Sequence, residues 1–471
     1  MAEAKVGKSN GTGNGSNGLS ATSFNEALNT PISTQYDVIV AGGGASGLIA
    51  AVSAARAGAR TALIERAGCL GGTGTASMVA QWVGFFNRET RVVGGLPFEL
   101  TERVRQAGGS DGFRRYIMGE ALSNPLPLVN FPFNPEIVKI AADEFASDVD
   151  VLLQSQVVGP IVNDGRVEGI VLQNVSGRTG LGAKFVVDAT GDGVIAAAAG
   201  VPLADVEFDN HSKQPCTLVF RLSNIDVRRF RDLPREKKRE IAVEGVKRGD
   251  LPWESLSFCS TPGGSDAISL MSRLHGIDAL NAAEVSQAII NGRQQIKRLL
   301  PFLRENVPGF ENAVLSSIAE QLGVRETRRI VGRYTLTEED IVANRRFEDS
   351  IALGAGPVDV HHENGTGVRL WMPEKPFEIP LRVMQPEHVQ GLVVTGRTVS
   401  ATREANGGAR HMGTAMALGE AAGVYAALSA QNGKEASAQA VRDVLRSRGA
   451  LISEEDAIVL SRSEAEAIPP I

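Results

Sequence analysis

The sequence predicts an α/β protein in which a mostly parallel sheet is assembled from three distant segments. Each segment is an apolar run that ends in a glycine-containing turn: YDVIVAGGG (36–44), AKFVVDATGDG (183–193) and GLVVTGRT (391–398). Buried parallel strands are covered on both faces, so they appear as uninterrupted apolar runs of this kind. The stretches between the segments, at 101–150 and 204–384, predict an inserted α+β substrate domain.

The first segment continues into a helix and a second strand. Val38–Val40 form the first predicted strand and RTALIE (60–65) the second. Between them, apolar residues recur with helical spacing and so predict a helix with one face against a sheet: Leu48, Ala51, Val52 and Ala55. Gly58 ends this helix. Strand, turn, helix and strand in this order predict a Rossmann-like nucleotide-binding unit.

Three glycines in the first turn, Gly42, Gly44 and Gly47, match the dinucleotide-binding pattern GxGxxG. The first permits a tight turn, the second lets the backbone approach a pyrophosphate, and the third allows close packing of helix and strand. The helix N-terminus offers free N–H groups and a positive dipole end to phosphates. Glu65 ends the second strand, where a carboxylate accepts hydrogen bonds from ribose hydroxyls.

Further glycine turns favour a flavin over a nicotinamide cofactor. Gly71–Thr75 follow the second strand, Ala189–Gly193 follow the next, and Gly396–Arg397 follow the last. An extended flavin dinucleotide requires several loops, because its pyrophosphate and its ring system lie far apart. The later motif ALGAGPVDV (352–360) continues into β-prone residues rather than a helix, so it does not predict a separate NAD(P)H domain.

These segments together resemble the glutathione-reductase-type flavin fold. More narrowly, GVRETRRIVGRYTLTEEDI (323–341), PVDVHH (357–362) and TGRTVSATREANGGARHMGTAMALGEAAG (395–423) resemble the FAD-dependent oxidoreductases, distant relatives of the succinate dehydrogenase and fumarate reductase flavoproteins. The resemblance extends from Tyr36 to about Leu451. It implies FAD as the cofactor and says much less about the substrate.

The resemblance also implies which residues contact the cofactor. The pyrophosphate would lie on the first glycine turn, the adenosine ribose near Glu65, and the adenine against the backbone of Val157. The full implied set is Gly42, Gly44, Ala45, Ser46, Gly47, Glu65, Arg66, Gly72, Thr73, Thr75, Val157, Ala189, Gly191, Asp192, Gly396 and Arg397. For Asp192 a helix N-cap is an equally good interpretation. Relatives that bind flavin covalently carry a histidine in the early loop. No histidine precedes His211 here, so non-covalent FAD is expected.

These motifs divide the chain into seven parts. We expect a disordered extension (1–34), three FAD-binding parts (35–100, 151–203 and 385–432), two substrate-side parts (101–150 and 204–384), and a C-terminal helix and tail (433–471). The extension is rich in Gly, Ser, Asn and Thr and lacks the apolar core of a signal peptide.

Composition excludes several function classes. The 471 residues carry a net charge of −6 without a basic block, so a nucleic-acid partner is not expected. No apolar run approaches the roughly 20 residues of a membrane-spanning helix. Three separated cysteines without a CxxC motif fit free thiols in a reducing compartment, and a cytoplasmic location is expected. His361 and His362 are too few for a metal site, so no metal is expected.

Candidates for substrate chemistry lie in two places. Four arginines crowd residues 325–333, either as a salt-bridge network or with Arg325 or Arg328 holding a substrate carboxylate or carbonyl. Near the C-terminus, Arg410 and His411 precede a helix rich in Gly, Ala and Met. His411 is the candidate acid or base because its unperturbed pKa lies near neutrality, or else it is a structural histidine. Glu404 is a weaker candidate.

The helix after His411 is expected to aim its N-terminus at the flavin. There the N–H groups of Gly413, Thr414 and Ala415 would stabilise negative charge on the reduced ring. The sequence thus predicts an FAD-dependent oxidoreductase that dehydrogenates or reduces a small organic substrate by hydride transfer through flavin N5. A flavin monooxygenase using NAD(P)H and oxygen, and a flavin-bearing electron-transfer subunit, are the alternatives. The sequence identifies neither the electron acceptor nor the oligomeric state, and a homo-oligomer is one of the possible states.

Overall fold

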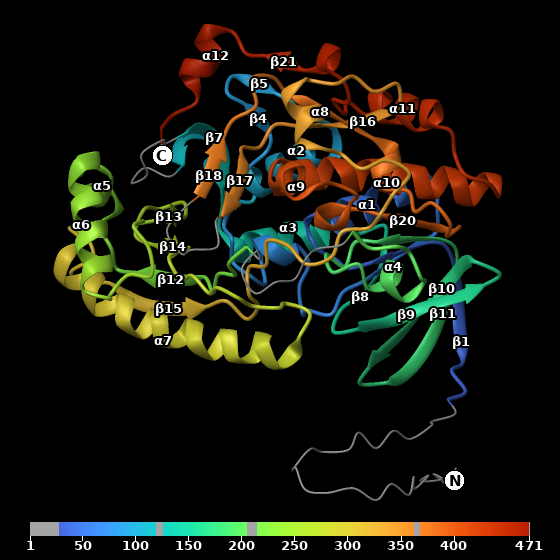
Figure 1. Cartoon of the computed structure of the whole chain (residues 1–471), viewed down its shortest axis with the longest axis horizontal. Coiled ribbons are helices and arrows are strands. Elements are labelled where there is room, and N and C mark those ends of the chain that lie inside the picture. Colours follow the sequence, from blue (N-terminus) through green and yellow to red (C-terminus); the bar gives the residue numbers. More distant parts are fainter. Residues whose placement is uncertain (1–27, 119–125, 205–213, 362–367, 471) are drawn as a thin grey trace, which may run out of the picture.

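The computed structural model describes residues 28–118, 126–204, 214–361 and 368–470. Its central sheet has the strand order β8-β2-β1-β11-β10-β9, with β20 also paired to β11. The strands of this sheet are β1 (Ile32–Ala41), β2 (Thr61–Ile64), β8 (Asp150–Leu152), β9 (Gln156–Asn163), β10 (Arg166–Asn174), β11 (Gly177–Asp188) and β20 (Leu392–Val394). β1, β2, β8, β11 and β20 are parallel, whereas β9 and β10 are antiparallel. The predicted parallel sheet from three distant segments is therefore confirmed (Figure 1).

β11 joins the three predicted segments. One edge pairs with β1 over most of its length, and the other edge pairs first with β10 and then, from Val186 to Asp188, with β20. The turns after β1, β11 and β20 therefore lie at the same edge of the sheet, where the carboxyl ends of parallel strands form ligand sites. β1 begins at Ile32, so the last residues of the predicted 1–34 extension belong to the sheet. Residues 1–27 of that extension lie outside the described residues.

Helix α10 (Met412–Asn432) packs tightly against α1 (Ala45–Arg56) and contacts β11. A Cβ on Gly419 would clash with the carbonyl oxygen of Ser46, and a Cβ on Gly423 would clash with that of Ala50. The small residues of α10 therefore serve the close approach of two helices. This closeness fixes the start of α10 relative to the glycine turn after β1.

The larger insertion builds an antiparallel sheet with the order β13-β14-β12-β15 and three helices beside it. Its elements are β12 (Phe220–Ser223), α5 (Val227–Arg231), α6 (Arg235–Lys247), β13 (Phe258–Ser260), β14 (Ala267–Ser269), α7 (Ala282–Asn306) and β15 (Val314–Ile318). α7 is the long helix at the outer edge of this unit in Figure 1, and Gly292 brings it against Leu218.

Further helices and short strands complete the fold before α10. They are η1 (Gly72–Gly74), β3 (Gln81–Trp82), β4 (Phe86–Asn87), β5 (Thr90–Arg91), α2 (Gly95–Gln106), β6 (Arg114–Met118), β7 (Leu126–Pro132), α3 (Pro135–Phe145), α4 (Val194–Ala198), α8 (Glu338–Val342), β16 (Ser350–Gly354), β17 (Val358–His361), β18 (Val368–Trp371), β19 (Phe377–Pro380), η2 (Leu381–Val383), η3 (Gly396–Thr398) and α9 (Arg403–Ala409). β16 packs against α10, although its residues fall within the predicted 204–384 domain.

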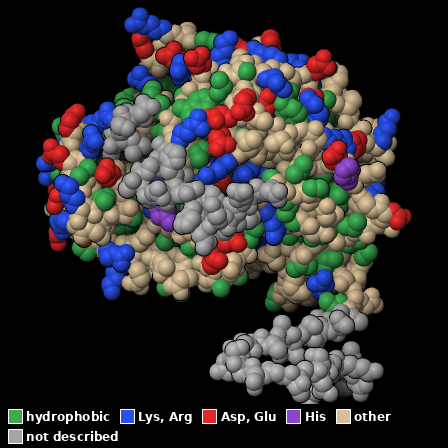
Figure 2. Space-filling view, viewed as in Figure 1, with side chains coloured by type: hydrophobic (Ala, Val, Ile, Leu, Met, Phe, Trp, Pro, Cys, Tyr) green, Lys and Arg blue, Asp and Glu red, His purple; other side chains and the backbone are tan. Residues whose placement is uncertain are grey.

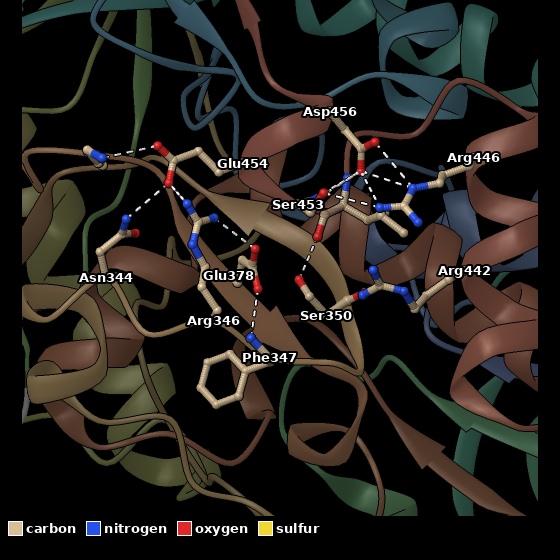
Figure 3. A network of polar contacts seen from close by, with 12 residues as sticks. Asn344, Arg346, Phe347, Ser350, Glu378, Arg442, Arg446, Ser453, Glu454 and Asp456 are labelled. Carbon is tan, nitrogen blue, oxygen red and sulfur yellow. Dashed lines mark hydrogen bonds and ion pairs between the residues drawn. The ribbon is translucent and has the colours of Figure 1, made fainter.

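The C-terminal segment is held on this body by a network of polar contacts (Figure 3). It comprises α11 (Ala438–Ser447), η4 (Glu454–Asp456), β21 (Ile458–Val459) and α12 (Arg462–Ala467). Arg446 pairs with Asp456 at 3.1 Å, and Arg346 bridges Glu454 and Glu378. β21 then pairs with β5. The last described residues lie beside β6, where the N–H of Arg115 donates to the carbonyl oxygen of Pro469 (2.9 Å).

The face of the molecule in Figure 2 carries Lys and Arg side chains interspersed with Asp and Glu. This mixture agrees with the small net charge of −6 and forms no extended basic patch on that face. Among the described helices, none has the length and apolar character to cross a membrane.

Candidate functional site

A cavity of about 560 Å³ opens at the carboxyl edge of the central sheet and extends into the inserted unit. This volume lies within the roughly 300–1,000 Å³ typical of ligand sites. We call one part the nucleotide side: Gly42, Gly44, Ala45, Ser46, Glu65, Arg66, Gly72, Thr73, Ala189, Thr190, Gly191, Thr395, Gly396, Arg397 and Ala415. We call the other part the substrate side. The part of it that adjoins the nucleotide side is lined by Thr217, Arg325, Asp359, Arg410, His411 and Met412.

The glycine turn after β1 has the geometry that a dinucleotide requires. Gly42 has φ +100°, and a Cβ there would stand 2.5 Å from the carbonyl oxygen of Ala189. A Cβ on Gly47 would clash with the carbonyl oxygen of Gly42. Gly44 differs, because a Cβ there would meet no atom within 4 Å although the residue lines the cavity. The space in front of Gly44 is therefore open for a group that needs close approach to the backbone.

Glu65 is buried at the edge of the nucleotide side. Its carboxylate accepts from the N–H of Gly43 (2.6 Å) and from the N–H of Ala67 (2.7 Å), one on each oxygen. These bonds tie the end of β2 to the glycine turn and fix the direction of the carboxylate. Because each carboxylate oxygen accepts more than one hydrogen bond, Glu65 keeps capacity for ribose hydroxyls.

Arg397 lies against Gly191 on the nucleotide side and is held there by Asp192. Its Nη2 donates to Oδ1 of Asp192 (2.8 Å), whose other oxygen lies 3.9 Å from Nη1 of Arg66. Nε of Arg397 is buried without a hydrogen-bond partner in the part of the chain that the structure describes. An unpartnered guanidinium nitrogen beside open glycine turns fits an anionic or carbonyl-bearing cofactor.

Asp192 itself does not line the cavity, and its interpretation as an N-cap is wrong. The N-cap of α4 is Gly193, and the free N–H groups of that helix donate instead to the buried Asp188. Asp188 accepts from Ile195 and Ala196, both at 2.9 Å, and from the hydroxyl of Thr190 at 2.7 Å. Burial raises the pKa of Asp188. In the sequence, Asp188 stands at the end of an apolar strand, and this position could have indicated its role at the start of α4.

The N-terminus of α10 differs from the expectation in detail. The N–H of Gly413 donates to the carbonyl oxygen of Val83 (2.9 Å), and that of Ala415 donates to His411 (2.8 Å). Neither group is therefore free for a ligand, and the lining includes Met412 and Ala415 but neither Gly413 nor Thr414. Backbone donors taken up by a neighbouring loop cannot be recognised from a local sequence pattern.

His411 is the N-cap residue of α10, and its ring packs against the backbone of Gly356. Nε2 lies 2.8 Å from the carbonyl oxygen of Pro357. Since a carbonyl only accepts, Nε2 carries the proton and Nδ1 is the acceptor of the neutral ring. Burial, with the positive charge of Arg410, lowers the pKa of His411 to about 4. The ring is therefore neutral at physiological pH, and its role as an acid or base stays a prediction.

Two arginines from distant segments meet on the substrate side. Nη2 of Arg410 donates to Oδ2 of Asp359 (3.2 Å), to the backbone oxygen of the same residue (3.0 Å), and to Gln214 (3.2 Å). Nη1 of Arg325 donates to Pro215 and to the hydroxyl of Thr217. Burial lowers the pKa of Arg325, and Arg410 adds to this effect. The side chain of Arg410 is only 11% exposed, so an anion reaching it would be largely dehydrated.

Other arginines of the cluster form salt bridges instead. Arg329 pairs with Glu326 at 3.4 Å in the interior, and Arg333 pairs with Glu435 at 2.7 Å. The salt-bridge interpretation is therefore confirmed for Arg329 and Arg333, whereas the role of Arg325 at the substrate stays a prediction. Arg328 does not line the cavity; its guanidinium lies 3.5 Å from the backbone oxygen of Asp192.

Three more predicted residues lie away from the cavity. Thr75 is buried, and its hydroxyl donates to the backbone oxygen of Leu70 (2.6 Å). Val157 is buried in β9, where Gln156 donates to its carbonyl oxygen (2.9 Å). Glu404 lies in the first turn of α9, and its negative charge acts on Arg329. None of the three lines the cavity.

The motif ALGAGPVDV now has a structural explanation. Gly354 ends β16 and packs against the ring of Phe377, and Gly356 leaves room for the ring of His411. Val358 then begins β17 instead of a helix. The glycines of this motif therefore accommodate side chains. They do not form a phosphate-binding turn, which agrees with the prediction that this motif is not part of an NAD(P)H domain.

The comparisons with known proteins agree with this geometry. Residues 37–448 match the model of the family described as FAD dependent oxidoreductase. A stretch of 43 residues is 54% identical to dihydrolipoyl dehydrogenase of Trypanosoma brucei brucei, but it covers only 9% of this chain and 9% of that protein.

Similar solved structures include two chains of low sequence identity. A geranylgeranyl bacteriochlorophyll reductase-like protein of Thermoplasma acidophilum has 17% identity and a TM-score of 0.44, with 90% of this chain and 85% of that chain covered. A p-nitrophenol 4-monooxygenase of Pseudomonas putida has 13% identity and a TM-score of 0.42, with 88% and 84% covered.

The cavity at the carboxyl edge of the parallel sheet fits a dinucleotide-binding protein of the α/β class. The chain belongs to the FAD-dependent oxidoreductase family, because the family match spans most of its length. Its cofactor is FAD, and the open space before Gly44 and the unpartnered Nε of Arg397 fit this group.

Proposed function

We propose that the protein is an FAD-dependent dehydrogenase or reductase that acts on a small organic anion. The observation that supports this most directly is the meeting of Arg325, Arg410 and His411 on the substrate side of the cavity whose other side carries the glycine turns. Bidentate hydrogen bonding and a fixed positive charge make arginine the preferred partner of carboxylates. FAD, when bound, supplies the acceptor or donor of a hydride at N5.

The residues of the chain would divide the remaining work. Asp359 holds Arg410 in place through its side chain and its backbone oxygen, so the guanidinium is oriented before any substrate arrives. Nε of Arg410 is buried and lacks a partner among the described residues, which leaves a donor for a substrate oxygen. His411 holds a proton acceptor, Nδ1, at the start of α10. A substrate anion beside this ring would raise its pKa and make it a better base.

We further propose that FAD is bound without a covalent bond. The lining of the nucleotide side includes neither histidine nor cysteine, and Nε2 of His411 is engaged by Pro357. Acid precipitation of the purified protein should release all flavin into the supernatant. Flavin that stays with the precipitate would refute this part of the proposal.

Anaerobic mixing of the oxidised holoenzyme with a panel of organic acids and of the matching neutral alcohols tests the reaction. We expect at least one acid, and no alcohol of the same skeleton, to bleach the flavin band without oxygen. Bleaching that needs NAD(P)H, with oxygen-18 entering the product, would favour a monooxygenase. Activity only with an added protein partner would favour an electron-transfer subunit.

A further inference from the structure

The substrate side continues beyond the two arginines into an apolar chamber within the inserted unit. Its wall contains Val227, Phe230, Leu256, Phe258, Leu270 and Phe310. The three phenylalanine rings contact one another, with centroid separations of 5.3 Å for Phe230–Phe258, 5.6 Å for Phe230–Phe310 and 4.7 Å for Phe258–Phe310. We use the term aromatic chamber for these six residues.

Local structure explains why this apolar surface faces the cavity. Phe258 and Ser260 of β13 line it, whereas Cys259 between them is buried in the core, as the alternation of a strand requires. Phe310 follows α7 and is 1% exposed, so its position is fixed by the packing of the inserted unit.

The cavity also has a wall from another part of the chain. Arg115–Met118 of β6 line it, and so does Pro470, which is anchored through the bond between Arg115 and Pro469. Elements far apart in the sequence thus surround the space. Enclosure of this kind suits a small molecule better than a protein segment.

Positive charge is concentrated where the chamber joins the nucleotide side. Arg325 and Arg410 lie there, and Asp359 neutralises only part of their charge. The two cations at the chamber itself are engaged by protein groups: Nζ of Lys238 lies 5.0 Å from the ring centre of Phe230 and donates to the backbone oxygen of Arg231 (3.4 Å), and the guanidinium of Arg231 donates to Ser260. An anionic group is therefore favoured at the arginines, and a hydrocarbon group is favoured among the phenylalanines.

We propose that the substrate is an amphiphilic organic acid whose carboxylate binds Arg325 and Arg410 and whose hydrocarbon body fills the aromatic chamber. This inference rests on the proposed function for the place of the carboxylate. Longer acids should bind more tightly than short ones, because the chamber removes more of their apolar surface from water and the gain is proportional to that area.

Calorimetric titration of the holoenzyme with acetate, butyrate, hexanoate and octanoate tests the proposal without any turnover. The dissociation constant should fall about fourfold for each added methylene group, which corresponds to about 0.8 kcal/mol per buried CH₂. 1-Octanol should bind at least about tenfold more weakly than octanoate, because it lacks the charge that the arginines recognise. Dissociation constants that do not change with chain length would overturn the proposal.

Leu256→Asp places a charge at the chamber and should remove the gain with chain length while leaving acetate binding unchanged. Ile290→Asp is the matched control, because Ile290 lies on α7 of the same unit, is 50% exposed and does not line the cavity. Equal loss of octanoate binding in both variants would contradict the chamber.

If Leu256→Asp does not fold, tryptophan fluorescence of the wild-type protein provides a second test. Trp253 is the tryptophan among the lining residues, so octanoate should change the tryptophan fluorescence and Trp253→Phe should abolish that change. No fluorescence change at saturating octanoate would argue against the chamber. Acids that bind in the chamber but never bleach the flavin would refute the proposed reaction and leave the chamber intact.

Discussion

The two sides of the cavity are built from different parts of the polypeptide. The nucleotide side consists largely of backbone: Gly42 fits only without a side chain, Gly44 faces open space, and few charged groups take part. The substrate side consists of side chains such as Arg325 and Arg410, supplied by segments that are distant in sequence. We therefore expect the nucleotide side to respond to added volume, and the substrate side to respond to removed charge.

The largest effect is expected from Gly44→Val. The new side chain would fill the space in front of the turn, so FAD affinity should fall about 100-fold or more, which is the scale of a steric penalty near 3 kcal/mol. Fluorescence titration of the apoprotein with FAD measures this.

Gly159→Val is the control for this change. A Cβ on Gly159 also meets no atom within 4 Å, but the residue lies in β9 and does not line the cavity. The control should bind FAD like the wild type. Equal weakening by both changes would mean that the loss comes from the fold.

Charge removal on the substrate side comes next. Arg410→Met should leave FAD binding unchanged and slow anaerobic flavin reduction at low acid concentration by about 10- to 100-fold, the scale of a lost hydrogen bond to a charged group. Stopped-flow absorbance measures the rate. Arg328→Met is the control, because Arg328 lies outside the lining. Two equally slow variants would contradict the assignment of Arg410 to the substrate.

The sequence predicted the nucleotide side better than the substrate side, for a physical reason. A glycine turn is a local feature, because Gly42 takes a positive φ within the turn and Gly47 packs against the carbonyl oxygen of Gly42 itself. The wrong assignments depend on hydrogen bonds to individual backbone groups, one within the same loop and one in a distant segment. The hydroxyl of Thr75 binds Leu70, and the N–H of Gly413 binds Val83, and neither partner is visible in a motif.

The substrate side shows the same limit. Arg325 and Arg328 are three residues apart in one motif, yet only Arg325 faces the cavity. The aromatic chamber was missed entirely, since Phe230, Phe258 and Phe310 are separated in sequence and none belongs to a recognisable motif.

A smaller effect, on the stability of the protein, is expected from a buried carboxyl group on α10, the helix that packs behind the nucleotide side. Glu420 follows Gly419 on α10 and accepts from the N–H of Leu96 (3.1 Å), while its Oε1 is buried without a partner among the described residues. Burial raises the pKa of Glu420 to about 7, from an ordinary value of 4.5. The folded protein therefore keeps a proton that the unfolded chain releases, so stability is lost as pH rises from 4.5 through 7.

Glu420→Gln should flatten this loss and stabilise the protein by roughly 1–3 kcal/mol at pH 8, because the glutamine stays neutral and still accepts from Leu96. Urea unfolding at pH 5 and at pH 8 measures the difference. Glu466→Gln, at an exposed site of α12, should change neither value. A variant whose stability falls with pH as steeply as that of the wild type would exclude Glu420 as the cause.

The smallest effect is expected from the pH dependence of His411. With a pKa of about 4 the ring of the free enzyme stays neutral at higher pH. The rate of flavin reduction at low acid concentration, which reports the free enzyme, should therefore vary less than about twofold between roughly pH 6 and 8 because of His411. His411→Gln should lower the rate without changing the shape of this profile. A sigmoidal rise centred near pH 6.5 in the wild type, absent from the variant, would show that the ring titrates near its ordinary value.

We propose that one cavity holds FAD on one side and an organic acid on the other. Difference absorbance of the bound flavin during titration of the holoenzyme with hexanoate tests it most directly. We predict a saturable shift of the flavin band, with the same dissociation constant that calorimetry gives and with a weaker response in Arg410→Met. Hexanoate binding detected by calorimetry without any change in the flavin band would contradict the claim, because the acid would then lie elsewhere.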